Sequence, residues 1–195
     1  MGDPYAVVKE SKPFWCLQER PMFHHLVSMV TSQEIAFAKG RAIRIQLYKM
    51  AEAATGHGIL TQQFIASLDV ETLKKMGLAE HRCELVKYLA TIPSKSHADD
   101  LNAYAVVRGV GSWTIKGLQI IFNLGPNVIL YEDKWIRKRL GEMIGQGEVT
   151  EKRAAELFKT WPGQESLMSY FLWRIQPSGI QKLLQNEPLL RADFV

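Results

Sequence analysis

Apolar residues recur mainly three or four positions apart along this chain, and sustained alternation of apolar and polar residues is almost absent. That spacing predicts amphipathic helices rather than half-buried strands. One such helix is expected to carry Ile43, Leu47, Met50 and Ala54 on its apolar face, with Gly56 ending it. The pattern therefore predicts an all-α protein.

Capping and turn residues delimit further helices. Asp69 and Thr150 have side chains that cap helix N-termini, and Pro93 closes a helix. The run Val128–Tyr131 is consistent with a short strand, but Pro126 favours an extended connector. The apolar side chains expected on the faces of these helices are Leu73, Met76, Cys83, Val86, Leu89, Ala90, Leu101, Tyr104, Ala105, Ala154, Leu157, Phe158, Trp161, Leu167, Tyr170, Phe171 and Trp173. Helices packed on helices, in one or two lobes, are the predicted architecture.

Composition narrows the class of protein. The chain has 195 residues, of which 47% are hydrophobic and 23% charged, which excludes disorder as the main state. No apolar run approaches the roughly 20 residues of a membrane span, and no signal peptide is visible, so we expect an intracellular protein. Cys16 and Cys83 fit a reduced compartment and exclude a four-cysteine cluster. The pair His24–His25 is expected at a surface or an interface rather than in a metal site.

The positive charge is concentrated in one part of the chain. The formal net charge is +4, and residues 105–140 hold six basic and two acidic side chains. The remaining residues are balanced, so the whole net charge maps to this stretch. One interpretation is a solvated helix face, and the other is a footprint for an anionic polymer.

The segment VVRGVGSWTIKGLQIIFNLG, residues 106–125, contains a candidate phosphate-binding turn. Gly109 and Gly111 permit positive φ and leave backbone N–H groups uncovered, and the next helix is expected to begin at Ser112 or Thr114. Uncovered amides at a helix N-terminus bind anions, although an ordinary helix–helix turn is the alternative. The basic residues that raise the local potential are Arg108 and Lys116.

The next segment, NVILYEDKWIRKRLGEMIG, contains a candidate catalytic carboxylate. Asp133 stands just before a helix and suits a simple N-cap. A carboxylate among cations beside a phosphate-binding turn also matches cleavage of an N-glycosidic bond, which develops positive charge on the sugar. The cations expected on the exposed face of this helix are Lys134, Arg137, Lys138 and Arg139.

In this order, the turn and Asp133 resemble the helix-hairpin-helix DNA glycosylase superfamily, and most closely its 3-methyladenine DNA glycosylase II (alkylbase) branch. Three further segments agree in order: MVTSQEIAFAKGRAIRIQLY, MGLAEHRCELVKYLATI and WPGQESLMSYFLWRI. The resemblance covers about residues 22–175, or 154 of 195, with the hairpin at about 106–118. It implies a single compact all-α unit over residues 1–195, with two helical lobes and an active-site cleft between them.

The resemblance also implies an activity: hydrolysis of the bond between deoxyribose and a flipped-out damaged, alkylated purine during base excision repair. Asp133 takes the place of the catalytic aspartate, and Trp173 and Trp113 take places in the base pocket. Members that also cut the strand carry a lysine where this chain has Trp113, so hydrolysis without strand cleavage is expected. Two alternatives stay open: a glycosylase/lyase that uses Lys116, and a DNA-binding protein without catalysis.

The remaining implications concern partners and cofactors. The expected partner of this monomer is double-stranded DNA with damaged bases, and no resident cofactor or metal is expected. A monovalent cation can be held by carbonyls of the hairpin when DNA is bound. Glu34 departs from the Gln or apolar residue usual in the segment that fills the gap left by the flipped base. The residues expected to bind DNA are Gln33, Glu34, Arg108, Gly109, Gly111, Lys116, Lys134, Arg137 and Lys138.

Overall fold

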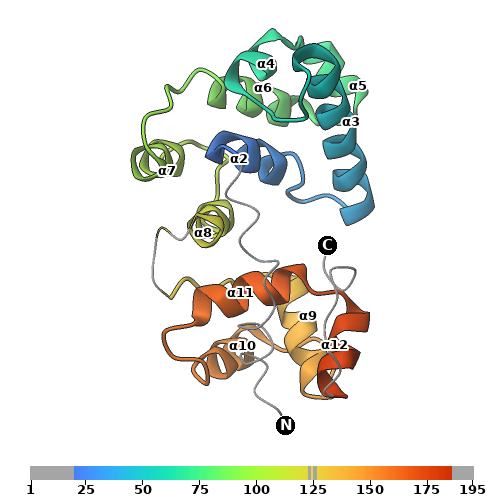
Figure 1. Cartoon of the computed structure of the whole chain (residues 1–195), viewed down its shortest axis with the longest axis vertical. Coiled ribbons are helices and arrows are strands. Elements are labelled where there is room, and N and C mark those ends of the chain that lie inside the picture. The colour runs from blue at the N-terminus through green and yellow to red at the C-terminus, as the bar shows by residue number, and fades with distance from the viewer. Residues whose placement is uncertain (1–19, 123, 125–126, 186–195) are drawn as a thin grey trace. The chain divides into compact units, whose positions relative to one another are not determined.

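The computed structural model describes residues 20–122, 124 and 127–185, and within them it contains eleven helices and no strand (Figure 1). The all-α prediction is confirmed for this part of the chain. No helix among these residues is long and apolar enough to cross a membrane. The helices are α2 (Met22–Val30), α3 (Phe37–Thr55), α4 (Gln62–Ser67), α5 (Val70–Lys75), α6 (Glu80–Leu89), α7 (His97–Ala105), α8 (Ser112–Ile121), α9 (Lys134–Met143), α10 (Glu151–Phe158), α11 (Glu165–Arg174) and α12 (Pro177–Leu184).

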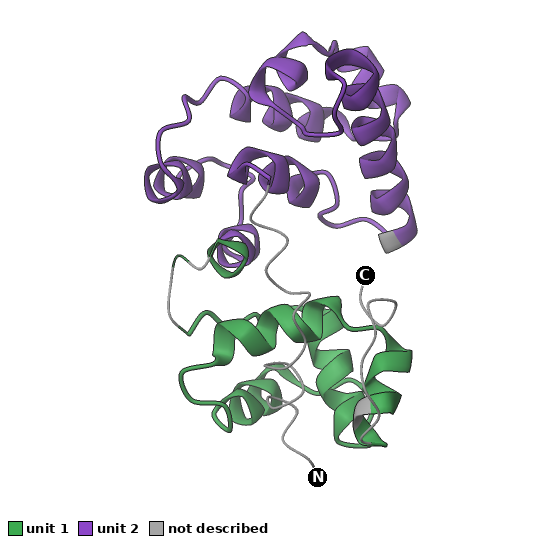
Figure 2. Ribbon diagram, in the orientation of Figure 1, with its two compact units in different colours: residues 1–18, 119–195 green, residues 19–118 purple. Residues whose placement is uncertain are grey.

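The helices group into two compact units, which Figure 2 shows in different colours. The first, here called the α6 unit, comprises residues 19–118. The second, here called the α9 unit, contains the helices that follow residue 119. Helix α8 begins in the α6 unit and ends in the α9 unit.

In the α6 unit, α6 is the central helix and packs against α2, α4 and α5. Its buried side chains include Cys83, Val86 and Leu89, each 0% exposed, at the three-residue spacing that the sequence predicted. The N-cap prediction for Asp69 is also confirmed, because its Oδ1 accepts a hydrogen bond from the backbone N–H of Thr72 at 2.5 Å.

Helix α3 buries a narrower stripe than expected. Ile43, Leu47 and Ala51 are almost fully buried, at intervals of four residues, and Gly56 ends the helix with φ 75° as predicted. Met50 is only half-buried and Ala54 is exposed. The four-residue interval moves the buried stripe one position away from both of them, so their assignment to the core face was wrong.

His24 lies in the core of the α6 unit and is 1% exposed, which corrects the expectation of a surface or interface pair. Its ring stacks on Tyr48 at a centroid distance of 5.0 Å, and its Nδ1 accepts a hydrogen bond from the backbone N–H of Leu60 at 3.0 Å. Burial, together with the nearby charges of Arg20 and His25, lowers the pKa of His24 to about 3.

In the α9 unit, α9 is the central helix and packs against α10, α11 and α12. Ile136 and Leu140 form its buried face. A Cβ added at Gly141 would lie 1.6 Å from the carbonyl oxygen of Gly147, so the loop after α9 packs directly on the helix backbone. Thr150 caps α10 as predicted, accepting a hydrogen bond from the backbone N–H of Arg153.

Helix α11 turns a different face to the core than the one predicted. Its buried side chains are Met168, Ser169, Phe171 and Leu172. Of the predicted positions, only Phe171 is among them, whereas Leu167, Tyr170 and Trp173 are half-buried. The mixed apolar surface of this helix leaves its rotation undetermined by spacing alone, and Ser169 is turned inward by its hydrogen bonds to the 128–130 segment.

Candidate functional site

The turn between α7 and α8 is tight and depends on Gly109. This residue has φ 98°, and an added Cβ would lie 2.8 Å from Cδ2 of Leu85 on α6. The Val110 N–H donates to the carbonyl of Val107 at 3.0 Å and closes the turn. Helix α8 begins at Ser112, as one of the two predictions had it. Thr114, the other candidate, is buried inside the helix.

Gly111 has a different role from Gly109. Its φ is not positive, so only Gly109 uses the positive φ that both glycines permit. An added Cβ at Gly111 would meet no atom within 4 Å, and the residue is exposed. The missing side chain therefore opens the backbone to the solvent instead of relieving a steric conflict.

A hollow of about 1480 Å³ lies beside this turn in the α6 unit. Its walls bring together six of the predicted site residues: Gln33, Glu34, Arg108, Gly109, Gly111 and Trp113. Tyr88 and Val106 also line it, and they are 56% and 85% exposed. Two parts of the predicted DNA-binding site therefore line the same hollow. They are the segment with Gln33 and Glu34, predicted to fill the gap left by the flipped base, and the hairpin predicted to bind the DNA backbone.

Arg82 links these parts of the hollow, although it was not predicted as a site residue. Its Nη1 donates to the carbonyl of Val30 at 2.9 Å and to Oε1 of Gln33, and its Nη2 donates to Oε2 of Glu34 at 2.7 Å. Gln33 in turn donates from Nε2 to Oγ1 of Thr114 on α8. The contacts join residues 48 to 81 positions apart, so no local pattern could have indicated them.

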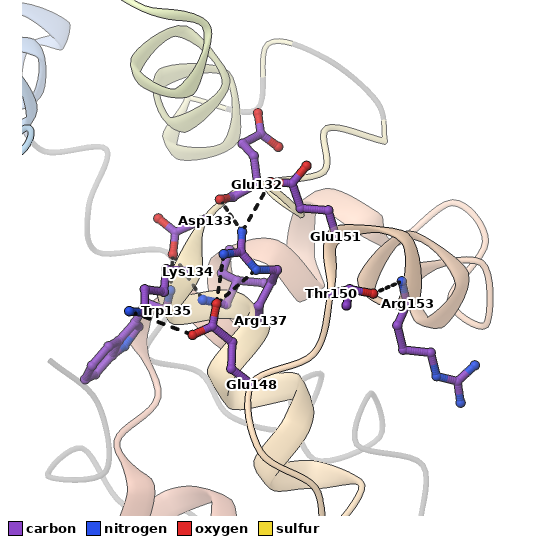
Figure 3. A network of polar contacts seen from close by, with 10 residues as sticks. Glu132, Asp133, Lys134, Trp135, Arg137, Glu148, Thr150, Glu151 and Arg153 are labelled. Carbon is purple, nitrogen blue, oxygen red and sulfur yellow. Dashed lines mark hydrogen bonds and ion pairs between the residues drawn. The ribbon is translucent and has the colours of Figure 1, made fainter.

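Asp133 is the N-cap of α9 (Figure 3). Its Oδ1 accepts hydrogen bonds from the backbone N–H groups of Trp135 at 2.8 Å and Ile136 at 3.0 Å. The N-cap interpretation of this residue is therefore confirmed. The two bonds hold the half-buried carboxylate in one orientation at the positive end of a helix.

The segment leading to Asp133 is fastened to α11. Ser166 Oγ accepts from the Val128 N–H at 2.7 Å, and Ser169 Oγ accepts from the Leu130 N–H and donates to the Val128 carbonyl. The Asp133 N–H donates to the carbonyl of Leu130 at 3.0 Å. The segment is the extended connector that was predicted, and side-chain hydroxyl groups take the place of a strand partner.

Arg137 lies within a polar network instead of projecting into solvent (Figure 3). Its side chain is 15% exposed, its Nη1 donates to the carbonyl of Glu132 at 2.6 Å, and its Nη2 donates to Oε1 of Glu148 at 2.8 Å. Glu151 is a further partner at 3.6 Å. These contacts restrain the backbone immediately before Asp133, and the DNA contact predicted for Arg137 stays a prediction.

The other cations of α9 divide into two kinds. Lys134 and Lys138 are exposed, as expected. Arg139 is fully buried, which corrects its assignment to the exposed face. Its Nε donates to the carbonyl of Ile175 at 2.9 Å, and its guanidinium lies 4.2 Å from the ring centroid of Trp135. Arginine is buried here because a carbonyl, a carboxylate and an aromatic face receive it.

Two predicted site residues lie on two further helices. Trp173 lies near the end of α11 and Lys116 lies on α8, and both are half-buried. In the described ranges, no group of three or more His, Cys, Asp or Glu side chains is arranged to hold a metal ion.

No family model matches the sequence, and no curated protein matches it significantly. Solved structures do match. A 3-methyladenine DNA glycosylase from Archaeoglobus fulgidus aligns with a TM-score of 0.63 and 18% identity, over 87% of this chain and 68% of that one. A 3-methyladenine DNA glycosylase from Schizosaccharomyces pombe, in complex with abasic DNA, aligns with a TM-score of 0.66 and 19% identity, over 87% and 88%. A DNA-3-methyladenine glycosidase from Bacillus halodurans aligns with a TM-score of 0.57 and 16% identity, over 93% of this chain and 90% of that one.

The chain has the fold of the helix-hairpin-helix DNA glycosylases. The resemblance recognised in the sequence is confirmed at this level. Identities of 16–19% do not carry catalysis or a substrate over to this chain, so its activity is argued below from its own residues.

Proposed function

We propose that the protein is a monofunctional DNA glycosylase of base excision repair, which hydrolyses the N-glycosidic bond of a flipped-out, alkylated purine. The observation that carries this proposal is the fixed carboxylate of Asp133 at the start of α9, in a chain with a glycosylase fold. Departure of the base develops positive charge on the deoxyribose, and a positioned carboxylate stabilises that charge. We assign the Asp133 carboxylate, which is oriented by its capping bonds, to the sugar or the attacking water.

The base must leave the helical stack before its glycosidic bond can be reached. By the resemblance, we assign Trp113 and Trp173 to the binding of the extruded base. A purine alkylated at ring nitrogen N3 or N7 carries positive charge, which an indole face attracts through a cation–π interaction. An indole that stacks on the extruded base therefore favours alkylated over normal bases.

The hairpin is assigned to the DNA backbone. The exposed backbone at Gly109 and Gly111, the N-terminus of α8 and the exposed Arg108 together suit a phosphate. A monovalent cation here would bind backbone carbonyl oxygens and neutralise phosphate charge. The turn offers such oxygens, since the carbonyl of Val107 accepts one hydrogen bond and has a second lone pair.

The chemistry is tested with Asp133→Asn. Asparagine caps helices as well as aspartate does, so this variant keeps the start of α9 while removing the negative charge. We expect release of alkylated bases from duplex DNA to fall by about 100-fold or more, with the Kd for DNA little changed. Asp69→Asn is the matched control, because it alters another capping aspartate, that of α5, and should leave base release unaltered. Full base release by Asp133→Asn would refute the assignment.

Two outcomes would replace the proposal with the alternatives. Borohydride trapping should yield no covalent adduct between the active protein and DNA, because Trp113 supplies no amine. An adduct that disappears in Lys116→Met would establish a glycosylase/lyase. Tight binding of damaged duplex without release of any base from a panel of modified substrates would establish a DNA-binding protein without catalysis.

A further inference from the structure

The hollow in the α6 unit contains an ion pair whose two members differ sharply in exposure. The side chain of Arg82 is 12% exposed, whereas that of Glu34 is 84% exposed. Arg82 is also held through Nη1 by the carbonyl of Val30 and by Gln33. The guanidinium is therefore fixed by its surroundings, while the carboxylate that it binds lies at the solvent.

Glu34 reaches Arg82 from a strained backbone. Its φ is 57°, in the left-handed region of backbone conformation that residues other than glycine rarely adopt. Such a conformation persists when contacts around it hold it in place, and it is found mostly at functional sites. The bond from Nη2 of Arg82 to Oε2 of Glu34, at 2.7 Å, is one of those contacts.

We propose that Arg82 forms an anion subsite for a DNA phosphate, and that the carboxylate of Glu34 occupies this subsite in the free protein. The proposal rests on the DNA-binding part of the proposed function. Carboxylate and phosphate oxygens bind a guanidinium in the same way, so a phosphate can replace Glu34 without moving Arg82. Arg108 and Gly109 line the same hollow, so the subsite and the hairpin face a common space.

A DNA phosphate can bind Arg82 only after the ion pair between Arg82 and Glu34 has broken. The free energy of breaking that ion pair therefore reduces the binding free energy of every DNA molecule. Glu34 thereby lowers the affinity for DNA in general and weakens its dependence on salt. Salt competes with the internal ion pair as well as with the phosphate, and the two effects partly cancel.

The test compares Glu34→Gln with Glu84→Gln, binding undamaged duplex DNA over a range of salt concentrations. Glu84 lines the same hollow and is exposed, but the carboxylate that Arg82 holds is that of Glu34. Glu34→Gln should raise affinity about fivefold at low salt. It should also steepen the slope of log K against log salt by up to about 0.9, the value of one phosphate contact. Glu84→Gln should change both quantities less.

A double-mutant cycle with Arg82→Met separates the subsite from simple charge repulsion. Without Arg82, Glu34→Gln should have no more effect than Glu84→Gln. An equal gain with and without Arg82 would overturn the proposal, as would a loss of affinity in Glu34→Gln. If Arg82→Met does not fold, equal salt slopes for Glu34→Gln and Glu84→Gln would overturn it without any change at Arg82.

These measurements use undamaged DNA and do not depend on base release. If Glu34→Gln shows the expected changes in affinity and salt slope but the wild-type protein releases no base, only the glycosylase chemistry is rejected. If the wild-type protein releases bases but Glu34→Gln changes neither the affinity nor the salt slope, only the phosphate subsite at Arg82 is rejected.

Discussion

The two units are each built around one central helix, but they assemble their polar sites differently. In the α9 unit, Asp133 is held by N–H groups only two and three residues further along the chain. In the α6 unit, Arg82, Gln33 and Thr114 meet across 49 and 81 positions. The first site is a local consequence of how a helix begins, and the second exists only because distant segments pack together. We therefore expect the two units to respond differently to substitution.

The largest expected effect concerns the backbone packing of the α9 unit. Gly141→Ala places a methyl group where the carbonyl oxygen of Gly147 lies, so the loop after α9 must move. We expect the free energy of unfolding to fall by about 3 kcal/mol, measured by denaturant titration. Gly147→Ala is the control, because an added Cβ there meets nothing within 4 Å. Equal midpoints for the two variants would contradict this account of the packing.

The two hairpin glycines should separate stability from binding. Gly109→Ala combines a left-handed φ with a close approach to Leu85, and should cost about 2 kcal/mol of stability. Gly111→Ala should leave the melting temperature almost unchanged, since its Cβ is unobstructed, but should weaken DNA binding by covering the exposed backbone. Thermal melts and DNA titrations of both variants check this. If Gly111→Ala binds DNA as tightly as the wild type, the backbone at Gly111 does not contact a phosphate.

The α6 unit should also be the more sensitive to mild acid. The pKa of His24 is about 3 in the native state and lies near its ordinary value of 6.5 in the unfolded chain. Between these values the unfolded state binds a proton that the native state does not, so stability falls as the pH drops below about 6.5. The slope from this residue is up to about 1.4 kcal/mol per pH unit. His24→Gln should flatten the stability profile, whereas His81→Gln, at an exposed position, should not.

The smallest expected effect distinguishes two cations of α9. Arg137→Met should lower kcat about tenfold at unchanged Kd, because it frees the carbonyl of Glu132 next to Asp133. Lys138→Met should leave kcat unchanged, weaken DNA binding and reduce the salt slope by about 0.9. Single-turnover kinetics and DNA titrations measure these quantities. If Arg137→Met instead weakens binding as Lys138→Met does, with normal kcat, Arg137 contacts DNA as the sequence predicted.

The helices and their caps were predictable because they depend on residues within one turn of each other. Asp69, Thr150 and Asp133 all cap the helices that were expected of them. Hairpin geometry was half predictable, since spacing identified the two glycines but could not tell which one requires positive φ.

Two of the errors arose where a polar residue is buried by partners from elsewhere in the chain. Arg139 and His24 were placed at the surface by their chemistry, yet inside the protein they form hydrogen bonds with backbone groups of Ile175 and Leu60 respectively. The positive stretch is likewise less exposed than its composition suggests, because Glu142 and Glu148 pair with Arg139 and Arg137.

By itself, the sequence determined the helical class of the described part, the position of the hairpin and the capping role of Asp133, because each follows from local spacing and side-chain chemistry. Only the tertiary structure decided which charges remain available to a ligand. Whether a guanidinium faces solvent or a carbonyl depends on segments far apart in the chain, and burial makes such pairing obligatory. Arg82 shows this most clearly, since its partners Val30, Gln33 and Glu34 lie about 50 residues earlier.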